Sequence, residues 1–220
     1  MRGENAWLLI SGGRFEPDCL AAVLHEKQFS EIVAIDGGAA YCRSAGLRPT
    51  LAVGDFDTID HGSMDWLLSE KVPLHSLPCQ KDMTDTAAAV ELAISRGVTQ
   101  IHLVAGMGSR FDHSYGNLLL LTKAEQAGVA LMLHSTGQRL RLLIPGRHQL
   151  TRDTRYPYLS FFAWMGPVEG LSLTGLAYSL TDYRLCPEDP LCISNTWGGM
   201  TATVDFREGR LLMVEACDEA

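Results

Sequence analysis

Apolar runs that alternate with helix-like segments are the feature that most restricts the fold of this chain. The runs occupy 7–10, 31–35, 51–53, 73–77, 100–105 and 129–133. Segments with helical spacing or a helix-ending glycine lie between them, at 16–28, 39–45, 61–71, 84–96 and 112–127. Strands that are apolar on both faces are typical of parallel sheets covered by helices. We therefore predict an α/β fold, with a mostly parallel N-terminal sheet and helices on both of its faces.

The pattern changes near residue 136. Beyond it the apolar runs are short, at 140–144, 158–164, 171–173, 200–206 and 211–214, and turn residues separate them without an intervening helix. This spacing predicts a C-terminal all-β sandwich or barrel. We expect an α/β domain at 1–136 and a β domain at 137–220.

The composition argues against two classes of partner. A net charge of −8 without clustered Lys and Arg is unlike a nucleic-acid-binding protein. No apolar run approaches the ~20 residues of a membrane-spanning helix. The apolar patch at 7–10 is shorter than a signal-peptide core of roughly 7–15 residues. We expect a cytoplasmic protein with neither a membrane nor a nucleic-acid partner.

Polar and glycine residues gather where the predicted strands end. Ser11, Gly12 and Gly13 follow the first strand, and Asp36 and Gly37 follow the second. Parallel strands share one carboxyl edge, and ligands of open α/β sheets bind there. The pattern therefore predicts a ligand site at that edge of the sheet.

Two carboxylates follow the third strand. The sequence L-A-V-G-D-F-D-T at 51–58 places Asp55 and Asp57 at alternate positions, so in an extended chain they point the same way. Two like charges side by side favour a cation between them, and Mg²⁺ prefers oxygen ligands. By itself the pair also fits a polar loop with a helix cap.

Two further clusters precede helices. Lys81, Asp82, Thr84 and Asp85 stand at the start of 84–96, where Asp82 can also serve as a helix cap. The segment 106–113 reads G-M-G-S-R-F-D-H, and a glycine-bearing loop before a helix is a natural phosphate cradle. The same glycines also suit an ordinary turn.

Three residues in and after this second loop are further candidates. Arg110 can neutralise phosphate oxygens, and His113 and Asn117 share one helix face. Asp112 fits a structural cap as well as a functional role.

A fourth cluster lies in the β half, where S-N-T-W-G-G occupies 194–199. Alone it is a turn with an aromatic residue. The chain lacks both a G-x-x-x-x-G-K-[ST] phosphate loop and a G-x-S-x-G nucleophile elbow. Taken together, the clusters favour magnesium-assisted transfer from a nucleotide, in which positioning and charge neutralisation supply most of the catalysis.

These motifs, in this order, resemble those of the thiamine pyrophosphokinases. The resemblance rests on D-G-G at 36–38, G-D-F-D-T at 54–58, K-D-M-T-D at 81–85, the loop at 106–113 with Asn117, and S-N at 194–195. It implies the family's two-domain build and the transfer of the diphosphate of ATP to the hydroxyl of thiamine, which releases AMP. It also implies a homodimer that holds thiamine between the α/β domain of one subunit and the β domain of the other.

The resemblance also implies roles for individual residues. Asp55, Asp57 and Asp85 would hold Mg²⁺ and the phosphates of ATP, with Arg110 and Asp112 beside them as further catalytic residues. The nucleotide site would include Asp36, Gly37, Lys81, Asp82, Thr84, His113 and Asn117. Ser194 and Asn195 would contribute from the β domain, and either Asp57 or Asp112 would take the proton of the thiamine hydroxyl.

One aromatic position departs from the family pattern. Animal members carry a late tryptophan that stacks on the substrate, and Met213 stands at the nearest position here. We predict that Trp197 replaces it, because an aromatic face suits a cationic thiazolium or a pyrimidine.

Three other functions remain to be separated from this one. A diphosphokinase for another hydroxymethyl compound, such as a pterin, would use a related α/β domain. A non-catalytic sensor of nucleotide or thiamine would bind without turnover. A purely structural protein would leave the ordered motifs unexplained.

Overall fold

Parallel strand pairing organises the first part of the chain. The computed structural model describes residues 5–79, 82–108 and 110–218. The chain divides into two units, Met1–Thr136 and Gly137–Ala220. In the first unit six strands run in the order β6-β5-β1-β2-β3-β4, and each neighbouring pair is parallel. Their bounds are Ala6–Ile10 (β1), Glu31–Ile35 (β2), Leu51–Gly54 (β3), Leu74–Ser76 (β4), Gln100–Val104 (β5) and Ala130–Ser135 (β6).

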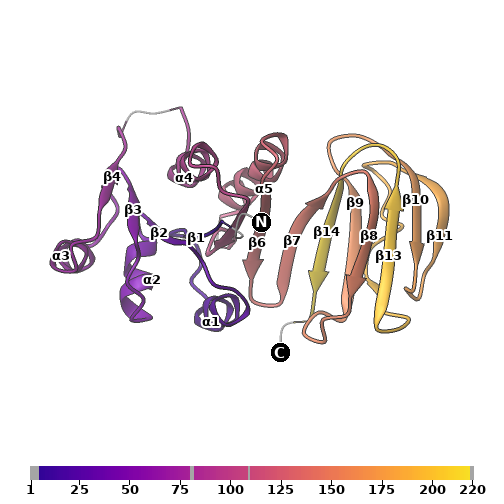
Figure 1. The fold of residues 1–220 in the computed structure, drawn as a ribbon, viewed down its shortest axis with the longest axis horizontal. Helices are drawn as coiled ribbons and strands as arrows, with labels where there is room; N and C mark the ends of the chain where they lie inside the picture. The colour runs from indigo at the N-terminus through magenta and orange to yellow at the C-terminus, as the bar shows by residue number, and fades with distance from the viewer. Residues whose placement is uncertain (1–4, 80–81, 109, 219–220) are drawn as a thin grey trace. The chain divides into compact units, whose positions relative to one another are not determined.

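Helices cover both faces of this sheet. They are α1 (Pro17–Glu26), α2 (Gly38–Ser44), α3 (His61–Ser69), α4 (Asp85–Ser95) and α5 (Phe111–Gln126). Figure 1 shows α1 and α2 on one side of the sheet and α4 and α5 on the other. β1 is buried along its whole length, as expected for a central strand. The predicted α/β class with a mostly parallel sheet is confirmed.

The second unit is an antiparallel sandwich. Its strands are β7 (Gln138–Leu143), β8 (Gly146–Thr151), β9 (Tyr158–Ala163), β10 (Val168–Thr174), β11 (Leu180–Leu185), β12 (Asn195–Thr196), β13 (Thr201–Phe206) and β14 (Leu211–Ala216). They form the layers β12-β9-β14-β7 and β11-β10-β13-β8. Phe161 from one layer and Phe206 from the other are almost fully buried in one apolar core. The expectation of a C-terminal β domain is confirmed.

The sequence pattern missed three strands, β8, β11 and the two-residue β12. β8 and β11 lie at the two edges of one layer, β11-β10-β13-β8, and β12 lies at an edge of the other. In β8 only Leu150 is buried, and in β11 only Leu185. An edge strand needs few apolar residues and often carries charge, so it leaves little signal in the sequence.

No helix in the described part of the chain is long and apolar enough to cross a membrane.

The first turn of α2 lies very close to the end of β1. A Cβ at Gly38 would lie 2.0 Å from the carbonyl oxygen of Ile10, whereas one at Gly37 would come no nearer than 3.6 Å to Gly12. Gly38→Ala should therefore lower the free energy of unfolding by about 1–3 kcal/mol, because helix and strand must move apart. Urea unfolding measures the change, with Gly37→Ala as the matched control. Equal effects of the two substitutions would contradict this account of the packing.

Candidate functional site

A cavity of about 560 Å³ opens at the carboxyl edge of the parallel sheet. Its walls come from the turns after β1, β2 and β5 and from the first turns of α4 and α5. The described residues that line it include Ser11, Gly12, Gly13, Asp36, Gly37, Thr58, Thr84, Asp85, Thr86, Gly106, Gly108, Arg110, Asp112, His113 and Asn117. The cavity lies where the sequence predicted a ligand site.

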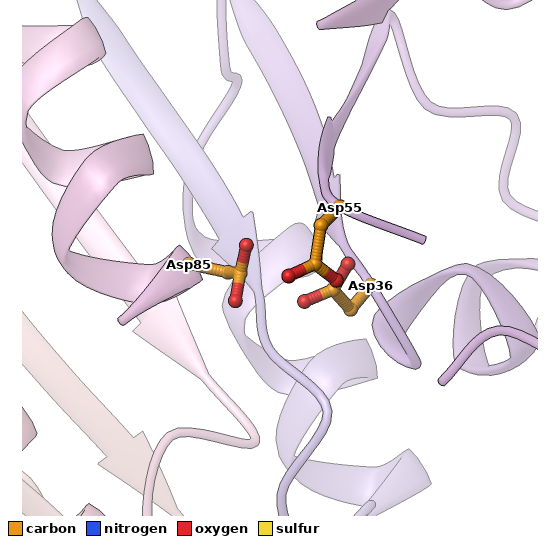
Figure 2. Close-up of side chains that lie close together, drawn as sticks. All are labelled: Asp36, Asp55 and Asp85. Carbon is orange, nitrogen blue, oxygen red and sulfur yellow. The ribbon is translucent and has the colours of Figure 1, made fainter. Parts of the chain in front are cut away.

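Three carboxylates from different elements converge beside this cavity. Asp36 follows β2, Asp55 follows β3, and Asp85 is the first residue of α4. One carboxylate oxygen from each lies within 4.8 Å of those from the other two. Figure 2 shows the three carboxylates facing one another, with Asp85 at the start of its helix. We call these three residues the acid group.

The backbone around Asp36 is built for this arrangement. Asp36 adopts a φ of 43° directly after its strand, and its Oδ1 accepts a hydrogen bond from the backbone N–H of Phe56 at 3.2 Å. A Cβ at Gly54 would lie 1.7 Å from the same oxygen. Glycine at 54 therefore makes the space into which the Asp36 carboxylate fits.

The crowding of the acid group changes its protonation. Burial, followed by the negative charge of Asp85, raises the pKa of Asp36 to about 7. The hydrogen bond from Phe56 acts in the opposite direction and is outweighed. Near neutral pH this carboxyl group therefore exchanges readily between its charged and its protonated form.

The acid group has the chemistry of a site for a hard divalent cation. Carboxylate oxygens are the protein ligands that Mg²⁺ uses most, commonly together with phosphates of the substrate. A bound cation would offset both the burial of the Asp36 charge and its repulsion by Asp85, which together raise the pKa of Asp36. The residues present therefore fit magnesium.

The extended backbone from which a shared direction of Asp55 and Asp57 was expected does not continue through these residues. Strand geometry ends at Gly54, and Phe56 takes a φ of 61°, so side chains no longer alternate between faces. The backbone N–H of Asp57 donates to Oδ1 of Asp55 at 3.3 Å, while the Asp57 side chain is exposed. In the structure Asp36 stands in the acid group, where the sequence had suggested Asp57.

The glycine loop before α5 is held by side chains of that helix. Nδ2 of Asn117, which is buried, donates to the carbonyl oxygen of Gly106 at 2.6 Å. Oγ of Ser114 accepts from the backbone N–H of Gly108 at 3.1 Å. Asn117 therefore lines the cavity and also shapes the loop, a structural role that the sequence did not suggest.

Arg110 and Asp112 form an exposed ion pair at the mouth of this loop. Two hydrogen bonds join them, Nε to Oδ1 at 3.1 Å and Nη2 to Oδ2 at 2.5 Å. The guanidinium group holds the pKa of Asp112 below its usual range. Arg110 occupies the position before the helix, so Asp112 is not its cap.

At the start of α4 the cap is Thr84 and not Asp82. Oγ1 of Thr84 accepts from the backbone N–H of Ala87 at 3.2 Å. Asp82 is exposed and does not line the cavity. Lys81, which was predicted to join the nucleotide site, lies outside the described residues.

Two hydroxyl contacts on the cavity wall were missed by the sequence pattern. Ser11 and Thr86 are both buried, and their oxygens lie 2.9 Å apart. Tyr41 donates its hydroxyl to the carbonyl oxygen of Gly13 at 2.6 Å. Ser11 and Gly13 had been placed at the predicted ligand site, but their contacts were not predicted because each partner is more than 25 positions away in the sequence.

In the second unit the predicted substrate residues have clear structural roles. The Asn195 side chain is buried, and it bonds both the N–H and the carbonyl oxygen of Tyr178, at 3.0 and 2.7 Å. Nε1 of Trp197 donates to the carbonyl oxygen of Tyr156 at 3.1 Å, and its half-buried ring packs against the core. Ser194 is exposed, with a φ of 56°.

Comparisons with known proteins point to one family. Residues 24–133 match the family described as "Thiamin pyrophosphokinase, catalytic domain", and residues 147–211 match "Thiamin pyrophosphokinase, vitamin B1 binding domain". The thiamine pyrophosphokinase of Bacillus subtilis (strain 168) is 28% identical over 186 residues, which cover 84% of this chain and 87% of the relative.

Solved structures agree with this match. The crystal structure of the enzyme from Geobacillus thermodenitrificans is 28% identical, with a TM-score of 0.85 over 98% of this chain and 99% of that one. The yeast enzyme is 14% identical, with a TM-score of 0.83 over 99% of this chain and 88% of that one. At that identity the yeast likeness concerns the fold alone.

The raised pKa of Asp36 predicts a pH-dependent loss of stability in the metal-free protein. In the unfolded chain this carboxyl releases its proton near pH 4, and in the folded chain near pH 7. Between these values the folded state binds more protons, so its stability falls as the pH rises. Relative to Asp36→Asn, the wild-type free energy of unfolding should fall by on the order of 2 kcal/mol between pH 5 and pH 8.

Urea unfolding in a chelator at several pH values measures this difference. The Asp36→Asn variant is the control, because it keeps every other titrating group. Parallel pH curves for the two proteins would contradict the predicted protonation of the acid group.

Proposed function

Because the chain belongs to the thiamine pyrophosphokinase family, we propose that its cavity binds ATP for diphosphate transfer to thiamine. The products of this reaction are thiamine diphosphate and AMP. The observation that carries the proposal is the acid group, three carboxylates within 4.8 Å beside a cavity of about 560 Å³. The glycine turns on the same cavity wall support it, since a phosphate needs donors as well as a cation.

The phosphates of ATP would bind the turns at 11–13 and 106–108 and the first turn of α5. Backbone N–H groups in such turns, and at the start of a helix, point toward an anion. Arg110 would exchange its ion pair with Asp112 for phosphate oxygens, because phosphate also accepts two parallel hydrogen bonds from a guanidinium group. Asp36, Gly37, Thr84, His113 and Asn117 line the same cavity and would complete the nucleotide site.

Magnesium would be held by the acid group, with Asp57 as a further ligand from the same loop. When bound, the ion offsets the negative charge that grows on the phosphate oxygens during transfer. Each carboxylate comes from a different element, so the sheet and α4 together set the spacing of the ligands.

The proton of the thiamine hydroxyl would pass to a carboxylate as the oxygen attacks the β-phosphorus. Asp57 and Asp112 are the two candidates. The ion pair with Arg110 lowers the pKa of Asp112, and release of Arg110 to the phosphates would remove this effect and make Asp112 a stronger base.

Thiamine would meet residues of the second unit, which matches the vitamin B1 binding domain of the family. We propose Ser194, Asn195 and Trp197 as its contacts, and a homodimer in which two subunits share each site. The ordinary charge and hydropathy of the chain support a cytoplasmic location.

Substitution of Asp55 tests the assignment directly. Asp55→Asn should reduce AMP release from thiamine, ATP and Mg²⁺ by at least about 100-fold, because an amide neither carries the charge nor holds the cation in the same way. Asp65→Asn is the matched control, since Asp65 is exposed on α3. AMP release at the wild-type rate in Asp55→Asn would contradict the proposed site. A panel of hydroxymethyl compounds in the same assay separates thiamine from a pterin.

The aromatic contact is tested by Trp197→Ala and Trp197→Phe. The alanine variant should raise the KM for thiamine roughly tenfold, equivalent to about 1.4 kcal/mol of binding, while phenylalanine keeps most of it. Thermal unfolding of both variants is needed as a control, because the indole N–H also bonds to Tyr156. A KM that is the same in all three proteins would show that Trp197 serves only the core.

A further inference from the structure

We propose that the buried hydroxyl pair formed by Ser11 and Thr86 positions Asp85 within the acid group. This inference rests on the proposed function, in which the acid group holds a divalent cation. Neither residue belongs to the motifs that the chain shares with its family, and neither hydroxyl group is assigned a role above. They would act as positioning residues, since they set a ligand without taking part in the transfer.

The pair joins two elements whose ends form the cavity. Ser11 directly follows β1, the central strand, and its backbone N–H donates to the carbonyl oxygen of Val104 at the end of β5 at 3.1 Å. Thr86 is the second residue of α4, directly after Asp85. Oγ of Ser11 and Oγ1 of Thr86 lie 2.9 Å apart, and either can be the donor.

Both hydroxyl groups lie on the cavity wall, yet little of either residue is exposed. Ser11 has 8% of its surface exposed and Thr86 has 7%. A buried hydroxyl that loses its partner costs free energy, so each group favours the geometry that keeps the bond. The contact therefore resists movement of the first turn of α4 away from β1.

The apolar packing of α4 does not hold that turn by itself. The buried apolar residues of the helix begin at Ala89 and continue with Val90 and Ala93, one turn or more beyond Asp85. Thr84, which caps the helix, is exposed. The hydroxyl pair thus anchors the end of the helix that carries the carboxylate.

The position of Asp85 matters because the acid group tolerates little displacement. Mg²⁺ needs ligands at 2.0–2.1 Å in near-octahedral geometry, so a carboxylate that moves by about 1 Å no longer reaches it well. Asp36 and Asp55 follow neighbouring strands of one sheet, and they are positioned by its hydrogen bonds. Asp85 comes from a helix and needs its own link to the sheet.

Binding of Mn²⁺ to the protein without nucleotide tests the inference, with electron paramagnetic resonance or calorimetry as the readout. Thr86→Val keeps the shape of the side chain and removes the hydroxyl, and it should raise the Kd for Mn²⁺ about fivefold. Ser11→Ala should have a similar effect. In the double variant the Kd should rise by much less than the product of the two changes, because both substitutions break the same bond.

Rescue and control variants separate positioning from general stability. Thr86→Ser restores the hydroxyl and should bring the Kd for Mn²⁺ back to within about twofold of wild type. Ser30→Ala removes a serine hydroxyl that bonds Asn5 and Ala6 at the opposite edge of the same sheet, and it should leave Mn²⁺ binding unchanged. In turnover, Thr86→Val should raise the Mg²⁺ concentration for half-maximal rate while the KM for thiamine stays constant.

The outcomes distinguish this inference from the proposal beneath it. If wild-type protein binds Mn²⁺ in a manner that Asp55→Asn abolishes, and Thr86→Val binds it equally well, the inference alone is overturned. If Thr86→Ser is as weak as Thr86→Val, the hydroxyl is not the cause and the inference also fails. If wild type does not bind Mn²⁺ at all, the proposed metal role of the acid group fails, and this inference falls with it.

Discussion

Repulsion among three carboxylates is the constraint on which the candidate site depends. Asp36, Asp55 and Asp85 are held with oxygens within 4.8 Å of one another, and the pKa of Asp36 rises to about 7 as a result of burial and of the charge of Asp85. This repulsion destabilises the folded protein without a metal, and a cation that binds between the carboxylates would relieve it. The crowding that destabilises the metal-free protein therefore supports the proposed role of the acid group as a divalent-cation site.

The rest of the first unit serves to keep those carboxylates together. Parallel pairing of β2 with β3 places their carboxyl ends side by side, so Asp36 and Asp55 lie close together although they are distant in the sequence. Gly54 leaves the space that the Asp36 side chain occupies. Asp85 arrives from the other side on α4, and the Ser11–Thr86 contact links that helix to the central strand. The site is thus a property of the sheet edge and not of any single loop.

The second unit follows a different principle. Its two layers pack apolar side chains such as Phe161 and Phe206 into one core. The side-chain amide of Asn195 forms hydrogen bonds with the backbone of Tyr178. Asn195, which was proposed as a ligand contact from its sequence motif, therefore has a structural role as well. Both roles are compatible, because a buried side chain can hold the neighbouring exposed Ser194 in a fixed conformation.

The sequence by itself determined the two-part architecture, the family, and the edge of the sheet at which the site lies. It could do so because apolar periodicity and turn residues are local signals, and because each motif is a short continuous segment of the sequence. It missed the edge strands β8 and β11, where burial of one leucine each leaves almost no pattern. Only the tertiary structure decided that Asp36 joins Asp55 and Asp85, and that the backbone leaves the extended conformation at Phe56. Which side chains meet depends on the strand order and on the φ angle of Phe56, and the spacing of residues in the sequence predicts neither.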